Sequence, residues 1–336
     1  MRMSNFVDKA QVAAQMLKGV VKRTPLTYSQ HLSSMTGNAV YLKQENLQHS
    51  GSCKARSAGY MLSTLSPEQK SRGVVTVSTG NNGISMTMAM QQHGINGVVF
   101  VPNTIAPHKV QRMGDLGAKL VFVGDDIVES EVEARAYAAH TNCPFLSPYN
   151  EWGAIIGQGT IALEIVEQLT AFGKGLNCIF VPVGGGGLIS GVGGYLKAVD
   201  PATKVIGVQP LNSPVMVRSL EAGEIILIES KPTLSDATAG GVEQGAITFD
   251  LCRKLADNFA LVSEEEMWSA MLMLYEHHGI VVEGSGALSV AALLQQSALW
   301  KGKTIVLLLC GSNIADELLE QLRSYPRTDR AHAGHG

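Results

Sequence analysis

Short apolar runs alternate with helix-like segments through the first half of the chain. The runs at 73–77, 97–101, 119–123 and 144–147 have the length and composition of buried β-strands, and the segments between them carry apolar residues at helical spacing. Strand–helix alternation of this kind indicates a parallel sheet with right-handed crossovers. The pattern therefore predicts one sheet built from these four runs.

The alternation begins again after residue 151, and it predicts a second sheet. Its strands are expected at 39–43, 178–183, 204–209 and 304–309. Helices are expected at 8–21, 84–94, 107–116, 129–140, 160–169, 213–221, 264–279 and 286–295. We expect an α/β fold of two doubly wound domains with mainly parallel sheets. The predicted parts are a large discontinuous domain (1–70 and 148–330), a small mobile domain inserted in it (71–147) and a frayed tail (331–336).

Composition excludes several classes of protein. Of the 336 residues, 45% are hydrophobic and 16% are charged, which suits a large folded core and not a disordered chain. The net charge of −3 has both signs scattered, so we expect no nucleic-acid partner. Five separated cysteines, short apolar runs and an N-terminus without a signal-like segment predict a cytoplasmic protein with no membrane partner.

A run of four glycines, Gly184 to Gly187, follows the predicted strand 178–183 and precedes a predicted helix. Glycines there let backbone amides at a helix N-terminus approach an anion. Neither the dinucleotide fingerprint GxGxxG nor the P-loop Gly-Lys-Ser/Thr fits the run. A phosphate monoester is therefore favoured over a dinucleotide, and a tight turn without a ligand is the alternative.

Two further polar loops follow predicted parallel strands. The loop Ser78-Thr79-Gly80-Asn81-Asn82-Gly83 follows strand 73–77, and Cys310-Gly311-Ser312-Asn313 follows strand 304–309. The carboxyl ends of parallel strands are where α/β sheets bind ligands. Amides of the first loop can hold a carboxylate, and Ser312 can bond a ring nitrogen. A helix-capping loop is the alternative for the first motif, and a strand-ending turn is the favoured interpretation of the second when it is taken singly.

One lysine lies in a turn of small residues just before a predicted helix: Lys54, within residues 50–58 (SGSCKARSA). An isolated lysine is usually a solvated surface charge, so this position gains weight only from the other three loops. Elsewhere, Glu283 precedes a predicted helix and is read as a cap. The nine histidines lack the spacing of zinc ligands.

These four motifs in this order resemble the fold-type II pyridoxal-phosphate enzymes. The resemblance is greatest to the serine/threonine dehydratase family, which includes serine racemases and hydroxyamino-acid dehydratases. It runs from about Thr24 to Ser312 and also covers residues 157–165, 232–249 and 282–288. It implies an architecture like that of the tryptophan synthase β subunit, pyridoxal 5'-phosphate as the cofactor, and a homodimer.

The resemblance also implies residue roles. Lys54 would form the Schiff base with the cofactor and act as the catalytic base. Gly184, Gly185, Gly186 and Gly187 would hold the cofactor phosphate, Asn81 would bond the ring hydroxyl, and Ser312 would bond the pyridine nitrogen. The substrate carboxylate would be bound by Ser78, Thr79, Gly80, Asn81 and Asn82. Thr79 also stands where racemases of the family carry a catalytic serine.

The chain departs from the family pattern beside these motifs. Cys53 replaces a usual phenylalanine, Ser57 a glycine and Asn82 a histidine, which bears on substrate preference more than on reaction type. Positions that hold a divalent cation in the family are Gln209 and Val215 here, so we expect no metal. The chain also ends soon after Ser312, and no regulatory domain is expected.

The sequence is therefore interpreted as a dehydratase that converts a β-hydroxy-α-amino acid, of the L-threonine or L-serine type, to a 2-keto acid and ammonia by α,β-elimination. An amino-acid racemase and a dehydratase for 3-hydroxyaspartate or phenylserine are alternatives with the same cofactor. A non-enzymatic protein that binds a phosphorylated ligand is the alternative from another class, and Lys54 would then be dispensable.

Overall fold

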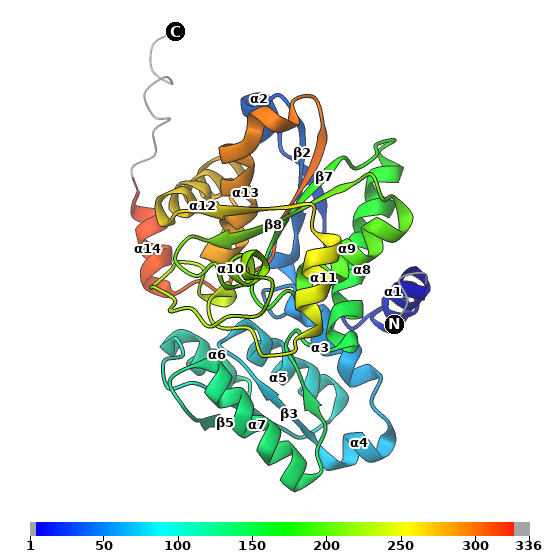
Figure 1. Cartoon of the computed structure of the whole chain (residues 1–336), viewed down its shortest axis with the longest axis vertical. Helices are drawn as coiled ribbons and strands as arrows, with labels where there is room; N and C mark the ends of the chain where they lie inside the picture. Colours follow the sequence, from blue (N-terminus) through cyan, green and yellow to red (C-terminus); the bar gives the residue numbers. More distant parts are fainter. Residues whose placement is uncertain (1–4, 326–336) are drawn as a thin grey trace.

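The computed structural model describes residues 5–325, which form two β-sheets with helices packed around each (Figure 1). Helices α4 to α7 gather around the smaller sheet at the lower end of the molecule in that view. Helix α3 lies where the two parts meet, and it packs against α8 of one part and α5 of the other. The expected α/β fold with mainly parallel sheets is confirmed.

The larger sheet has six strands in the order β1-β2-β10-β7-β8-β9, and all neighbours are parallel except β1 and β2. The strands are β1 (Leu26–Tyr28), β2 (Ala39–Gln44), β7 (Cys178–Pro182), β8 (Lys204–Pro210), β9 (Asn258–Val262) and β10 (Thr304–Leu309). The four expected strands are present. The two edge strands, β1 and β9, were not expected: both are partly exposed, and β1 has only three residues.

The smaller sheet is fully parallel, in the order β5-β4-β3-β6. Its strands are β3 (Val74–Val77), β4 (Gly97–Val101), β5 (Lys119–Phe122) and β6 (Phe145–Leu146), as the alternation predicted. The helices that connect them are α5 (Asn81–His93), α6 (Pro107–Asp115) and α7 (Ile127–Thr141). The domain boundaries given above stay predictions, and the tail 331–336 lies outside the described residues.

Helices cover both faces of the larger sheet. They are α1 (Phe6–Met16), α2 (Gln30–Thr36), α3 (Lys54–Ser63), α8 (Trp152–Ala171), α9 (Gly187–Val199), α10 (Val215–Ala222), α11 (Ile247–Leu255), α12 (Glu264–His278), α13 (Gly284–Gln296) and α14 (Asp316–Ser324). Helix α4 (Pro67–Arg72) lies near the smaller sheet. Four short helices, α2, α4, α11 and α14, were not expected. Helix α8 begins well before the expected 160–169, because glycines in its first turns interrupt the apolar pattern. Close packing requires Gly157, since a Cβ there would lie 2.8 Å from the Arg56 carbonyl oxygen.

Strand β10 shows why its sequence is continuously apolar. Val306 and Leu308 belong to the hydrophobic cluster on one face of the sheet, which includes α1, α8 and α9 residues. Ile305, Leu307 and Leu309 belong to the cluster on the other face, with α12 and α13. Successive side chains of a strand point to opposite faces. A strand covered on both sides therefore has no polar positions to alternate with.

A group of four buried charged residues, the Arg56 cluster (Lys43, Glu45, Arg56 and Glu164), ties α3 to β2 and α8. The Arg56 guanidinium donates two hydrogen bonds to Glu45 and two to Glu164, each 2.8 Å long. Lys43 Nζ donates to Glu164 Oε2 at 2.6 Å. Two cations thus face two carboxylates, with bidentate geometry that offsets much of the cost of burying charge.

Replacement of Arg56 by methionine is expected to lower the free energy of unfolding by about 3–5 kcal/mol, because Glu45 and Glu164 would remain buried without their partner. The measurement is a urea titration of the purified protein. Arg23→Met is the matched control: Arg23 pairs with Glu167 at 2.7 Å, but both side chains are about half exposed, so at most about 1 kcal/mol is expected. Equal losses in the two variants would contradict the account.

Candidate active site

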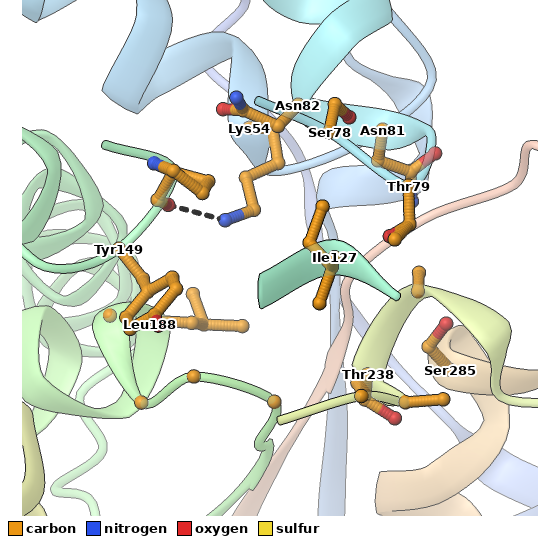
Figure 2. A pocket seen from close by; sticks show the side chains of 18 of the residues that line it. Lys54, Ser78, Thr79, Asn81, Asn82, Ile127, Tyr149, Leu188, Thr238 and Ser285 are labelled. Carbon is orange, nitrogen blue, oxygen red and sulfur yellow. Dashed lines mark hydrogen bonds between the residues drawn. The ribbon is translucent and has the colours of Figure 1, made fainter. Parts of the chain in front are cut away.

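One pocket collects most of the expected site residues from both sheets (Figure 2). Its wall includes Lys54, residues 78–79 and 81–82, the glycines 184–187 and the segment 237–241. Lys54 points into the pocket from the start of α3, and Thr79 lines the same space. The residues come from turns at the carboxyl ends of β3, β7 and β10 and from the start of α7.

Lys54 is held by a turn that is hydrogen-bonded to the end of β10. Gly51 has a left-handed φ of +74°, and the Cys53 amide donates to the Cys310 carbonyl oxygen at 2.9 Å. This pairing starts α3 at Lys54, whose Nζ donates to the Pro148 carbonyl oxygen at 2.6 Å. Burial lowers the pKa of Lys54, and no carboxylate of the described residues pairs with it. Lys54 is therefore more readily neutral than a surface lysine, as a nucleophilic amine must be.

The tetraglycine packs closely against a neighbouring aromatic ring. A Cβ on Gly185 would lie 2.6 Å from Tyr149 Cγ, and a Cβ on Gly187 would lie 3.0 Å from the Tyr149 backbone. Gly186 has a φ of +87° and precedes α9. The glycines are thus required both by close packing and by backbone conformation. The result brings the first amides of a 13-residue helix to the wall of the pocket, a geometry that favours phosphate.

In the loop after β3, part of the hydrogen-bonding capacity is already used. Ser78 Oγ accepts hydrogen bonds from the amides of Gly80 and Gly83, at 2.8 and 2.7 Å. The amides of Asn81 and Asn82 belong to the first turn of α5, whose N–H groups have no partner within the helix. Gly80 is not on the pocket wall, and a Cβ there would collide with Lys109. The structure thus places Ser78, Thr79, Asn81 and Asn82 at the pocket, but not Gly80.

The Asn81 side chain joins the two sheets. Its Nδ2 donates to Glu283 Oε1, and its Oδ1 accepts from Asn313 Nδ2 at 2.6 Å. An amide nitrogen carries two hydrogens, so one donor remains for a ligand. Glu283 stands at the N-cap position of α13, but its side chain makes no capping hydrogen bond and orients Asn81 instead.

Ser312 does not line this pocket in the structure, and its contact with the pyridine nitrogen stays a prediction. Its Oγ donates to the Asn46 carbonyl oxygen at 2.9 Å, away from the pocket. Cys310, two residues earlier, lines the pocket instead and is buried. Gly311 pairs with Ser52 in an isolated bridge that turns the chain after β10, so the residue at the strand end faces the ligand space.

Several wall residues were missed from sequence. Tyr149, Thr238 and Ser285 line the pocket, and they come from segments with no distinctive motif or with one interpreted as a helix cap. Ser285 is fully buried and its Oγ has no hydrogen-bond partner; the same holds for Asn82 Oδ1. Buried polar atoms in proteins are normally hydrogen-bonded. Two such atoms on one wall indicate that a polar ligand belongs there.

Gln209 stands where the family holds a divalent cation, and here its side chain binds two backbone groups. Gln209 Nε2 donates to the Val183 carbonyl oxygen at 3.2 Å, and Gln209 Oε1 accepts from the Val217 amide at 2.9 Å. Val215 is buried at the start of α10. Within residues 5–325, no three His, Cys, Asp or Glu side chains gather as a possible metal site.

Pyridoxal phosphate fits these residues. The glycines 184–187 at the start of α9 would hold its phosphate, and Lys54 would bond its aldehyde carbon. Asn81 keeps a donor for the ring hydroxyl, and Cys310 lies on the same wall. The unpartnered Ser285 Oγ offers a further polar contact.

Gly185→Ala is expected to abolish cofactor binding, because its Cβ would overlap the Tyr149 ring and displace the loop. Cofactor content would be measured from visible absorbance after dialysis. Gly175→Ala is the control, since nothing lies within 4 Å of a Cβ there. Full cofactor content in Gly185→Ala would refute the assignment of this loop.

Cys310→Ala is expected to shift the visible absorption of the bound cofactor, whereas Ser312→Ala is expected to leave it unchanged. The reason is that Cys310 lines the pocket and the Ser312 hydroxyl is bonded to a backbone carbonyl outside it. The measurement is an absorption spectrum of each purified variant. The reverse pattern would restore the assignment to Ser312.

Comparison with known proteins places this geometry in a family. A family profile described as "Pyridoxal-phosphate dependent enzyme" matches residues 17–311. The L-threonine ammonia-lyase of Thermotoga maritima is 40% identical over 316 residues, which cover 94% of this chain and 77% of that protein. A biosynthetic L-threonine dehydratase of Halalkalibacterium halodurans is 35% identical and covers 94% and 76%.

Solved structures agree with the sequence relatives. Maize serine racemase superimposes with a TM-score of 0.87 at 30% identity, covering 94% of this chain and 95% of that one. Processed threonine deaminase isoform 2 from Solanum lycopersicum gives 0.86 at 29% identity, covering 95% and 92%. With the profile matching most of its length, this chain belongs to the pyridoxal-phosphate-dependent enzymes of the threonine dehydratase and serine racemase type.

Proposed function

We propose that the protein is an ammonia-lyase that converts a β-hydroxy-α-amino acid, with L-threonine and L-serine as the first substrates to test, to a 2-keto acid and ammonia. The observation that carries the proposal is a pocket in which a lysine of lowered pKa and a glycine loop at a helix N-terminus share one wall. The relatives named threonine ammonia-lyase and threonine dehydratase support this reaction.

Bound pyridoxal phosphate supplies an electron sink for the electron pair left when a proton leaves the substrate Cα. Lys54 is the base for that proton. Its Nζ is the one lysine nitrogen on the described pocket wall, and burial without a carboxylate partner favours its neutral form.

The loop after β3 orients the substrate. The Asn81 and Asn82 amides at the start of α5 would bind the α-carboxylate, with the Thr79 hydroxyl beside them. A carboxylate fixed there restricts rotation about Cα, so the bond to be broken is presented to Lys54. Loss of the β-hydroxyl as water, followed by hydrolysis, gives the 2-keto acid and ammonia.

Water is excluded by apolar residues and glycines around the wall. Ile127 and Val128 of α7 pack closely on two glycines. A Cβ added to Gly240 would lie 3.2 Å from Ile127 Cγ2, and a Cβ added to Gly241 would lie 3.1 Å from Val128 Cγ2. These contacts join the smaller sheet to the segment before α11. We propose that residues 71–147 move as a unit to open and close this contact, as the domain prediction implies.

A racemase is the second candidate, because Thr79 brings a hydroxyl to the same pocket as Lys54 (Figure 2). A hydroxyl on a different side of Cα could return a proton and invert the centre. The similarity to maize serine racemase supports keeping this candidate. Chiral analysis of recovered substrate separates it from elimination alone.

The setting of the reaction is also proposed. We propose a homodimer in the cytoplasm, as the resemblance and the scattered cysteines imply. Between residues 5 and 325, no helix combines the length and apolar composition needed to cross a bilayer.

Lys54→Ala is expected to abolish release of keto acid from serine and threonine, by at least about 10³-fold, because the base is removed. The measurement is the rate at which the 2-keto acid forms, followed by its reduction in a coupled assay. Cofactor content is recorded for each variant. Lys174→Ala, an exposed lysine after α8, is the control and should retain activity. If Lys54→Ala keeps ligand binding and the wild type turns over no amino acid, the non-enzymatic alternative is favoured.

A further inference from the structure

Glu131 is the second charged residue on the wall of the pocket. Among the described residues that line the pocket, Lys54 is the only basic residue and Glu131 is the only aspartate or glutamate. Glu131 lies on α7, one turn beyond Ile127 and Val128, and its side chain is 6% exposed. The proposed elimination gives this carboxyl group no role.

Glu131 belongs to what we name the acidic corner, formed with Arg135 and Glu243. Arg135 donates to Glu131 Oε1 at 2.7 Å and to Glu243 Oε2 at 2.8 Å. Two carboxyl groups thus share one guanidinium. Arg135 is not on the pocket wall, and its guanidinium carbon lies 4.2 Å from the centre of the Phe145 ring. The Arg135 guanidinium therefore binds the two carboxyl groups outside the pocket. A ligand in the pocket would contact the carboxyl group of Glu131 and not Arg135.

Glu131 loses its proton near neutral pH and is mostly ionised above it. Burial and the neighbouring Glu243 raise the pKa of Glu131 to about 7. Glu243 is itself fixed, because its amide donates to Tyr149 Oη at 2.9 Å and its carboxylate accepts from Asn150. The corner is held in place by the same tyrosine that packs on the glycine loop.

The other polar groups of a substrate already have partners under the proposed function. The amino group would lie at the cofactor next to Lys54, and the α-carboxylate would bind at the start of α5. What remains is the substituent on Cβ. The wall also offers Asn82 Oδ1 and Ser285 Oγ, both buried and without partners. Asn82 Oδ1 can only accept a hydrogen bond, and the Ser285 hydroxyl can accept or donate one. Among the described wall residues, Lys54 is the only cation.

We propose that Glu131 determines the substrate range: it accepts β-substituents that are uncharged hydrogen-bond donors and excludes substrates with a second carboxylate. This rests on the proposed function, since it assigns the substrate of the same pocket. A side-chain carboxylate would lie against Glu131, whose one cationic partner, Arg135, is shared with Glu243. Serine and threonine are therefore favoured, and 3-hydroxyaspartate is disfavoured.

The test compares L-serine with L-threo-3-hydroxyaspartate in the holoenzyme above neutral pH, where Glu131 is ionised. We expect wild-type kcat/KM for serine to exceed that for 3-hydroxyaspartate by at least about 100-fold, and Glu131→Gln to narrow the ratio by about tenfold or more, equivalent to about 1.4 kcal/mol. The narrowing should come from the acidic substrate. The dissociation constant of 3-hydroxyaspartate should also be lower in Glu131→Gln than in the wild type. It is measured from the change in cofactor absorbance on titration.

Glu133→Gln is the matched control, because Glu133 lies two residues further along α7 on the exposed face and the variant has the same change of charge. Its ratio should equal that of the wild type. Glu131→Asp keeps the charge and should keep the exclusion, which guards against an effect of misfolding alone.

Two results would overturn the inference while leaving the proposed function intact: wild-type kcat/KM for 3-hydroxyaspartate within tenfold of that for serine, or a ratio in Glu131→Gln no different from that in Glu133→Gln. If the wild type turns over neither serine, threonine nor 3-hydroxyaspartate, the proposed function itself fails.

Discussion

The double ion pair of Arg56 is the constraint on which the site depends. Arg56 follows Lys54 by two residues, and its guanidinium is fixed from both sides by Glu45, after β2, and Glu164, on α8. Because charges buried at this depth are stable only with good geometry, they fix the start of α3 against the larger sheet. Lys54 is placed by this anchoring and by the pairing of its turn with the end of β10.

Function then arises where the two sheets meet. The larger sheet supplies the lysine, the glycine loop and Cys310, and the smaller sheet supplies the β3 loop and the wall of α7. The two are linked by polar contacts at the pocket: Asn81 with Glu283, Lys109 with Asp236 at 2.7 Å, and Arg135 with Glu243. If residues 71–147 move as proposed, a substrate that contacts both parts would favour the closed arrangement.

The sequence predicted the buried parts best. Strands covered on both faces are continuous apolar runs, so β3, β4, β7, β8 and β10 were found. Edge strands were predicted less well: β5 was found from its place in the strand–helix alternation, and β1 and β9 were not. Lys54 and the glycine loop stand out by composition. The orientation of Ser312 could not be predicted, because the direction of a side chain after a strand depends on the bridge between Gly311 and Ser52, which no local pattern encodes. Glu131 was missed for a related reason: only the fold brings α7 to the pocket.

The central claim is that Lys54 carries the cofactor in this pocket. The most direct measurement is borohydride reduction of the protein loaded with pyridoxal phosphate, followed by proteolysis and mass spectrometry. The account predicts a reduced pyridoxyl group on the peptide that contains Lys54, and on no other lysine in stoichiometric amount. A label on a different lysine, or no stoichiometric label at all, would contradict it.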